Sequence, residues 1–333
     1  MKKKYIITTA LITTVLSLCV FFSFLDSSQS EKTTVSMDTV VTVKVKGKNS
    51  DEAAGEILDI VKTLDSKYLS RFSEKSMTGI LNREKTVTDS ELAGFLLPLI
   101  SLSEKSNGRF DFTLSPLSDL WSFTSDPRIP KDSEIKAALQ NTGYKNVVLN
   151  GDTVTITDEN VSVDFGSAGK GIALDKIREY CDKKSSIKRV VASVGGSILC
   201  RGKGTFTVGI KKPGSPGGEI LAALTLKECC VSTSGSYERF FEEDGRIYHH
   251  ILDPKTGYPV DNGLVSTTLV GESGILSDAL ATACFAAGIE KGAALAAEYN
   301  FDAVFVDNQN TVYITPNLRN SITVSDGYSL VVV

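Results

Sequence analysis

Two oxygen-bearing side chains, Asp278 and Thr282, stand four residues apart inside the mostly apolar stretch Ser273–Gly288. The stretch predicts a helix, with Ser273 as its N-cap and Gly288 at its C-terminal end. The spacing places both oxygens on one face. A partly exposed Asp and a Thr bonded back to its own helix would explain the pair. A hard-cation site is the alternative, because Mg²⁺ takes few protein oxygens and completes its shell with substrate phosphate.

A glycine-rich turn is the second stretch with chemical potential. The sequence DFGSAGKGIALDKI (164–177) follows a strand pattern and runs directly into a helix pattern. Such a turn presents free backbone N–H groups at a helix N-terminus, where phosphate binds well. It matches neither a Walker A motif nor GxGxxG. An ordinary strand-to-helix connection therefore remains open, with Lys170 either neutralising a phosphate or facing water.

Both histidines of the chain are adjacent. His249 and His250 lie just before the turn DPKTG within RIYHHILDPKTGYPV (246–260). Side chains alternate along a strand, so one imidazole is expected to face inward and the other outward. A hydrogen-bonded core histidine is the structural alternative to a catalytic one.

The N-terminus has the pattern of an export signal. Three lysines at positions 2–4 precede an uncharged, mostly apolar run that ends at Leu25, and the run approaches the ~20 residues that span a bilayer. We expect residues 1–25 to form a signal anchor or signal peptide, residues 26–35 a linker and residues 36–333 the working domain. Cys19 follows a lipobox-like LSL, so a lipoprotein signal is the second interpretation of this segment. The positive-inside rule places the domain outside the cytoplasmic membrane, anchored by this segment.

Composition excludes several classes of function. Without the three N-terminal lysines the formal net charge falls from −4 to −7, and the chain has no basic patch, so nucleic acid is not expected as a partner. The six cysteines form neither a CxxC nor a Cys/His array. This argues against a zinc site and a disulfide framework, and favours small buried side chains.

The remaining pattern mixes helices and strands. Helices are expected at Asp51–Leu64, Ser90–Ser106 and Ile289–Asn300, and strands in MDTVVTVKVKG, KRVVASVGGSILC, TFTVGI, EILAALTL and CCVSTSG. FDAVFVD and TVYIT are expected to close the domain as a strand pair.

Taken together, these stretches resemble the ApbE family of FAD:protein FMN transferases. The matching segments are MDT, SRF, GRFDFTLSPLSDLWSF, DFGSAGKGIALD, SVGGS, TSGSYERFF, HHILDPKTGYPV and SDALATACFAAG, in this order from residue 37 to residue 288. The resemblance implies an α+β fold: a central, largely antiparallel sheet with flanking helices and an FAD cleft between lobes. It covers essentially the whole domain predicted to be exported.

The resemblance also implies a function. FMN would pass from FAD to a Thr or Ser hydroxyl of an extracytoplasmic target protein with release of AMP, and Mg²⁺ would be required. His250 would be the general base and Asp278 a catalytic residue and metal ligand. The implied flavin contacts are Met37, Phe72, Arg109, Phe110, Asp111, Asp164, Lys170 and Ile251, and the implied metal ligands are Ser167, Asp278, Ala281 (through its carbonyl) and Thr282.

Two positions depart from the family pattern. Phe72 stands where many members carry Tyr, so ring stacking would remain while a hydroxyl contact would be lost. Ser197 follows the glycine pair where members often carry Asp, Asn or Ala, and its role stays open.

Other functions share these residues. One alternative is Mg²⁺-dependent hydrolysis of FAD to FMN and AMP, and another is a membrane-anchored flavin-binding protein without turnover. The acceptor is expected to be an electron-transfer flavoprotein carrying a motif like D-[GAS]-x-[ST]-[AG]-[TS]. The chain itself begins such a motif at Asp326–Ser329, but Leu330 and Val331 fill its last two positions, so self-modification is not expected.

Overall fold

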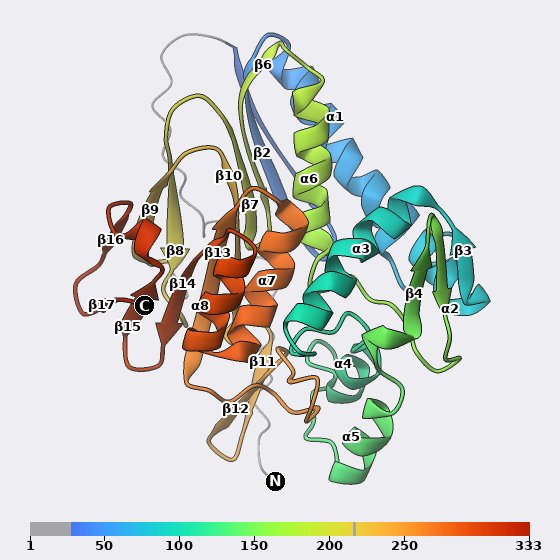
Figure 1. The fold of residues 1–333 in the computed structure, drawn as a ribbon. Coiled ribbons are helices and arrows are strands. Elements are labelled where there is room, and N and C mark those ends of the chain that lie inside the picture. The colour runs from blue at the N-terminus through green and yellow to red at the C-terminus, as the bar shows by residue number, and fades with distance from the viewer. Residues whose placement is uncertain (1–27, 216–217) are drawn as a thin grey trace.

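A computed structural model describes residues 28–215 and 218–333 and has the expected α+β fold (Figure 1). Its centre is a nine-stranded sheet in which all neighbours are antiparallel except the last pair. In spatial order the strands are β1 (Gln29–Ser36), β2 (Thr39–Gly47), β6 (Ile187–Val194), β7 (Ser197–Gly202), β10 (Cys229–Gly235), β13 (Leu264–Gly271), β14 (Asp302–Asp307), β15 (Thr311–Ile314) and β17 (Ser329–Val332).

Helices cover one face of this sheet (Figure 1). They are α1 (Ser50–Leu64), α6 (Gly169–Asp182), α7 (Gly274–Ala287) and α8 (Ile289–Glu298), and α3 (Ser90–Lys105) packs against α7. The packing of α1 on the sheet follows from the periods of the two sequences. Val41, Val43 and Val45 alternate along β2 and are buried. The apolar residues of α1 recur at helical spacing and meet them in the main core.

The opposite face of the sheet is partly covered by a second, three-stranded sheet. Its strands are β8 (Phe206–Lys211), β9 (Ile220–Leu226) and β16 (Ile322–Val324). They enclose a separate apolar cluster with residues of β6, β7, β10, β13, β14 and β15. Strands β1 and β2 contribute nothing to this cluster, and polar residues of both line the cleft described below.

Smaller elements lie beside the helical layer. They are α2 (Met77–Glu84), α4 (Ser115–Trp121), α5 (Asp132–Leu139), the sheet of β3 (Thr86–Thr88), β5 (Thr153–Ile156) and β4 (Val147–Asn150), and the hairpin of β11 (Phe240–Glu243) and β12 (Arg246–His249). Three short helical turns complete the chain, at Asp65–Leu69, Tyr144–Asn146 and Pro316–Leu318.

Trp121 joins two distant segments of this region. Its ring stacks on Phe123 and Tyr248, with centroids 5.7 Å apart in both pairs, and its Nε1 donates to the Gly257 carbonyl at 2.9 Å. The segment containing Arg109–Asp111 is thereby held against the hairpin that precedes His250.

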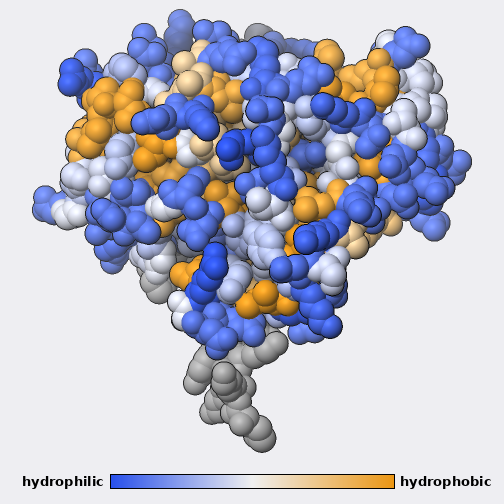
Figure 2. Space-filling view, turned by 60° about the horizontal axis from the view of Figure 1, so that its bottom comes forward, coloured by the Kyte–Doolittle hydropathy of each residue, from blue (hydrophilic) through white to orange (hydrophobic). Residues whose placement is uncertain are grey.

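Figure 2 shows the face that comes forward when the bottom of Figure 1 is turned to the viewer. This face is largely hydrophilic, and its hydrophobic side chains lie in separated groups.

The linker expected at residues 26–35 is wrong for most of its length. Gln29–Ser36 forms β1, and every one of its residues is paired with β2. The strand is polar on both faces, so it lacks the apolar–polar alternation that marks a half-buried strand. Ion pairs from Lys32 to Asp51 and from Glu31 to Lys44 help to hold it at the sheet edge. Residues 1–25 and Cys19 lie outside the described residues.

The helix predictions are confirmed with small shifts of boundary. Ser273 caps α7 by accepting from the Leu276 amide at 3.3 Å, and Gly288 ends the helix with φ at 80°. The predicted closing strand pair is present as β14 and β15, but it does not end the domain, because β17 adds a parallel strand beside β15. The five described cysteines are all free and buried, as expected.

Candidate functional site

A cleft of about 2090 Å³ runs between the sheet and the smaller elements. Its walls come from β1, β2, β6, β8 and β10 on one side and from the segments around residues 70, 110–127 and 250 on the other. Most of the residues predicted for the site line it: Met37, Phe72, Arg109, Phe110, Asp111, Asp164, Ser167, Lys170, His250, Ile251 and Thr282. Asp278 and Ala281 do not reach its surface.

Asp278 lies just behind the cleft wall with only 2% of its surface exposed. Its Oδ2 accepts from the Gly171 amide at 3.1 Å, and its Oδ1 accepts from the Ser197 hydroxyl at 3.1 Å. The ammonium of Lys170 lies 3.4 Å from the same Oδ1. Hydrogen bonds and one opposite charge therefore compensate the burial of this carboxylate.

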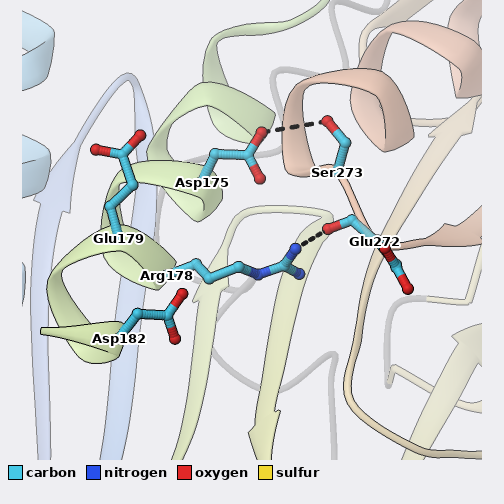
Figure 3. Close-up of a pocket in the computed structure, with 6 residues that line it drawn as sticks. All are labelled: Asp175, Arg178, Glu179, Asp182, Glu272 and Ser273. Atoms are coloured by element: carbon cyan, nitrogen blue, oxygen red, sulfur yellow. Dashed lines mark hydrogen bonds between the residues drawn. The ribbon is translucent and has the colours of Figure 1, made fainter.

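The glycine turn packs beside the helix that carries Asp278, so the two stretches can contribute to one site. A Cβ on Gly171 would lie 2.1 Å from the Gly274 carbonyl oxygen, so only glycine allows α6 and α7 to approach this closely. Asp175 strengthens the contact by accepting from the Gly274 and Ile275 amides at 2.6 and 2.9 Å. Figure 3 shows this carboxylate directed at Ser273 at the start of α7.

Lys170 connects Asp278 to the cleft. Its side chain is 25% exposed and it sits in the first turn of α6. Burial opposes its charge, but the carboxylates of Asp278 and Glu238 raise the pKa of Lys170 above its usual value. The side chain is therefore a cation at neutral pH, within reach of any anion in the cleft.

Thr282 and Ala281 differ in access. The Thr282 hydroxyl lines the cleft and hydrogen-bonds the Ser234 hydroxyl at 3.1 Å. Ala281 is fully buried inside α7, where a carbonyl ordinarily serves the helix's own hydrogen-bond ladder. Thr282 is thus well placed as a ligand, whereas the structure does not bring Ala281 to the cleft.

The remaining donor set suits a hard cation. Among the described residues there is no cluster of three or more His, Cys, Asp and Glu side chains that could hold a metal. The oxygens at hand are one buried carboxylate and the hydroxyls of Thr282 and Ser167. Such a sparse oxygen set fits Mg²⁺, which keeps several waters and binds substrate phosphates.

The two histidines have separate environments. His249 is buried, contacts the Phe285 ring edge-on, and hydrogen-bonds the Val260 carbonyl and the Ile251 amide. His250 lines the cleft, and its buried Nδ1 has no partner among the described residues. Burial lowers the pKa of His250 to about 3, and the charges of Arg239, His249 and Lys170 act in the same direction. His250 is therefore neutral at pH 7.

His249 has a structural role. It is absent from the site residues that the resemblance implies, and its packing in the core agrees with that. Replacing it by Ala is nevertheless not neutral, because two hydrogen bonds and an aromatic contact would be lost from the core. The same contacts fix the Ile251 backbone beside the cleft.

An aromatic side chain stands at the cleft rim. Phe72 is 78% exposed, and the guanidinium of Arg71 lies 4.0 Å from its ring centroid. Arg71 also forms an ion pair with Asp164 at 3.0 Å and another with Asp119. Phe72 is thus an exposed ring oriented by a fixed cation, suited to stack on a planar ligand.

The other predicted contacts are held by the backbone around them. Met37 and Asp38 both have φ at 55° and form the two-residue turn between β1 and β2, where the Met37 amide donates to Asp65 at 2.8 Å. Arg109 donates to the Ala286 carbonyl at 3.1 Å. Asp111 accepts from Thr113 and Tyr144; burial raises the pKa of its carboxyl, and these hydrogen bonds oppose the rise.

Several cleft residues were not singled out from the sequence. Arg71, Glu238 and Arg239 line the cleft and lie within quoted motifs, but the sequence assigns them no role. Ser197, whose role stays open from the sequence, is buried behind the cleft wall. Their partners are far away in the chain: Arg71 meets Asp164, and Ser197 meets Asp278. No local sequence pattern indicates such pairings.

Comparison with known proteins confirms the resemblance. A sequence model described as the ApbE family matches residues 37–305. A Klebsiella pneumoniae protein named FAD:protein FMN transferase is 33% identical over 227 residues, which are 67% of this chain and 71% of that protein. A Treponema pallidum protein of the same name is 29% identical over 316 residues, covering 86% and 87% of the two chains.

Solved structures agree. The ApbE protein from Thermotoga maritima is 29% identical with a TM-score of 0.75, and the match covers 90% of this chain and 97% of that one. The flavin transferase ApbE from Vibrio cholerae, at 23% identity, shares the fold with a TM-score of 0.78 over 88% and 99% of the two chains. The chain belongs to the ApbE family.

Proposed function

We propose that this chain is an FAD:protein FMN transferase that joins FMN to a Thr or Ser hydroxyl of a target protein and releases AMP. The names of its relatives support the activity. The observation that carries the proposal is the meeting of Lys170, the α6 N-terminus and Asp278 at the wall of a cleft that His250 also faces. A cation, the positive end of a helix dipole and a base suit phosphoryl transfer to a hydroxyl.

FAD would lie along the cleft. Its isoalloxazine ring would stack on Phe72, which is exposed and backed by Arg71. Its pyrophosphate would lie near Lys170 and the glycine turn, where the positive end of the α6 dipole favours negative charge.

His250 would act on the nucleophile. The acceptor oxygen forms a bond to the FMN phosphorus, the P–O bond to the AMP phosphate breaks, and the hydroxyl proton passes to a neutral ring nitrogen of His250. The Nδ1 atom has no partner in the described part of the chain. Arg239 and Lys170 help to lower the pKa of His250, so a bound pyrophosphate that offsets their charge would raise this pKa and strengthen the base.

Asp278, Thr282 and Ser167 would hold Mg²⁺, and Ala281 would contribute only if its carbonyl were freed from the α7 ladder. When bound, the ion acts as a Lewis acid on the pyrophosphate and offsets its charge. Asp278 is fixed for this task by Gly171 and Ser197.

We further propose that the chain works outside the cytoplasmic membrane, anchored by residues 1–25 or by a lipid on Cys19. The acceptor would be an extracytoplasmic electron-transfer flavoprotein with a motif like D-[GAS]-x-[ST]-[AG]-[TS]. The basic, then apolar N-terminus supports this location. Within residues 28–215 and 218–333, no helix is both long and apolar enough to cross a bilayer.

The fate of the flavin tests the function. The chain is incubated with FAD, Mg²⁺ and an acceptor carrying the motif, and the flavin that stays with denatured acceptor is separated from free flavin. Transferase activity predicts covalent flavin and an equal amount of AMP. Free FMN and AMP in equal amounts would indicate the hydrolase, and unchanged FAD would indicate flavin binding without turnover.

A further inference from the structure

The carboxylate of Asp278 has a cationic partner within the chain itself. Its Oδ1 accepts from Ser197 and faces the Lys170 ammonium at 3.4 Å, while its Oδ2 is used by the Gly171 amide. The carboxylate is nearly fully buried. An unpaired charge at this depth would be strongly destabilising, so Lys170 has a structural reason to stay there.

The same contact obstructs a divalent cation. A metal ligand must direct a carboxylate lone pair at the ion, and Oδ1 is the oxygen that faces Lys170. Among the described residues, Lys170 is the partner of Asp278 that both lines the cleft and carries charge. Two cations at one oxygen repel each other. Ser197 and Gly171 are neutral donors and present no such conflict.

The position of Lys170 allows it to move. It stands in the first turn of α6, where the helix dipole disfavours a cation. Its side chain passes Gly195, at which a Cβ would lie 3.4 Å from the Lys170 Cδ. Released from Asp278, the ammonium would enter the cleft it already lines.

We propose that Lys170 is a built-in counter-ion that holds the place of the divalent cation at Asp278 in the empty cleft and turns to the FAD pyrophosphate when the metal binds. This inference rests on the proposed function for the identity of the anion, although the exchange at Asp278 does not depend on turnover. Metal and FAD would then bind cooperatively. The metal replaces Lys170 at Asp278, and the FAD pyrophosphate takes up the released ammonium.

The test measures metal affinity without FAD or acceptor. Mn²⁺, a paramagnetic substitute for Mg²⁺, is titrated into the full-length chain in detergent and its free fraction is followed by electron paramagnetic resonance. Lys170→Met removes the ammonium and keeps the aliphatic stem. We expect it to bind Mn²⁺ more tightly by about 5–150-fold, the usual range of coupling between two sites.

Three matched variants control this result. Lys176→Met removes a charge from the same helix at a residue paired with Glu91 and Glu179, and should leave Mn²⁺ affinity unchanged. Lys170→Arg keeps a competing cation and should stay near wild type. Ser197→Ala removes a neutral donor to Asp278 and should not strengthen binding. Tighter Mn²⁺ binding by Lys170→Met but not by Ser197→Ala distinguishes competition from a general loosening of the site.

Thermal unfolding supplies a second measurement if Lys170→Met is unstable. Loss of the counter-ion should lower its Tm, and Mn²⁺ should restore the Tm by more than it raises that of wild type. Unchanged or weaker Mn²⁺ binding by Lys170→Met would overturn the inference. Because neither measurement involves FAD, that result would leave the transferase proposal standing.

Discussion

At the residue scale, the site depends on the buried carboxylate of Asp278 and the partly buried imidazole of His250, which differ in how many partners they have. Asp278 is charged and satisfied by three donors. His250 is neutral, and its buried Nδ1 is without a partner in the described structure. The first arrangement suits a metal ligand, and the second suits a group that accepts a proton.

Replacing Asp278 by Asn tests its charge. The amide oxygen can still accept from the Gly171 N–H, and the amide NH₂ can donate to the Ser197 hydroxyl, which rotates to accept. The side chain no longer offers a charged ligand to Mg²⁺. We expect Mg²⁺-dependent FMN transfer to fall by on the order of 10²-fold or more, with the circular dichroism spectrum of a folded chain. Thr282→Val should be milder, because a neutral ligand of similar size is lost. Wild-type turnover by Asp278→Asn would refute the metal assignment.

Replacing His250 by Gln separates catalysis from binding. Loss of a general base predicts a fall in FMN transfer of ~10²–10⁴-fold, with FAD affinity nearly unchanged. Single-turnover transfer and an FAD titration measure the two effects. If His250 only hydrogen-bonds FAD, affinity would fall and transfer at saturating FAD would survive.

The pH profile of wild type adds a second check on His250. The neutral ring is the active form of a base. Because burial and nearby positive charge lower its pKa to about 3, the ring stays neutral as pH falls from 7 to 5. The kcat/KM should therefore not fall with a midpoint near 6.5, the value of a free imidazole. A fall centred there in wild type that disappears in His250→Gln would contradict this account.

At the element scale, the contact between α6 and α7 forms the site. Gly171 and Gly274 bring the two helices together, and Asp175 of α6 caps the start of α7. The glycine turn before α6 and the Asp278 face of α7 meet as a result. The sequence stretches are separated by about a hundred residues, and neither has an evident function alone.

A methyl group at Gly171 should disturb this contact. Gly171→Ala places a Cβ against the Gly274 backbone, and we expect a loss of ~1–3 kcal/mol in unfolding free energy, as for other overpacked sites, together with weaker FMN transfer. Gly94→Ala on α3 is the control, because nothing lies within 4 Å of its added Cβ. It should stabilise the chain by up to ~1 kcal/mol. Equal effects of the two changes in urea unfolding would mean that close helix packing is not the cause.

The helices and strands that could be predicted are those with a clear local sequence pattern. Helices α1, α3 and α7 have strong apolar periodicity or clear caps and were found from sequence. Strand β1 was missed because both of its faces are polar, and β17 because it comes after an apparent closing pair and pairs in parallel. The residues placed in the cleft came mainly from family motifs. Roles that arise from long-range contact, such as Ser197 with Asp278 or Arg71 with Asp164, required coordinates.

At the scale of the whole molecule, one large sheet supports two layers and leaves a cleft lined by polar residues of β1 and β2. The cleft lies between the sheet and the smaller elements, so FAD would contact both. The proposed anchor would keep this cleft outside the membrane, beside an acceptor that carries electrons there.

Topology can be measured directly. A reporter that is active only after export, fused behind Val333, should be active, because residues 1–25 are expected to direct the domain across the membrane. A fusion lacking residues 1–25 is the control and should be inactive. Activity of a cytoplasm-only reporter on the full-length fusion would refute the location while leaving the chemistry untouched.

The most direct test of the central claim is the intact mass of the acceptor protein. After incubation with the chain, FAD and Mg²⁺, the acceptor should gain the mass of FMN less one water, and its variant with Val or Ala in place of the acceptor Thr or Ser should gain nothing. An acceptor of unchanged mass, in a reaction that converts FAD to free FMN and AMP, would contradict the transferase account.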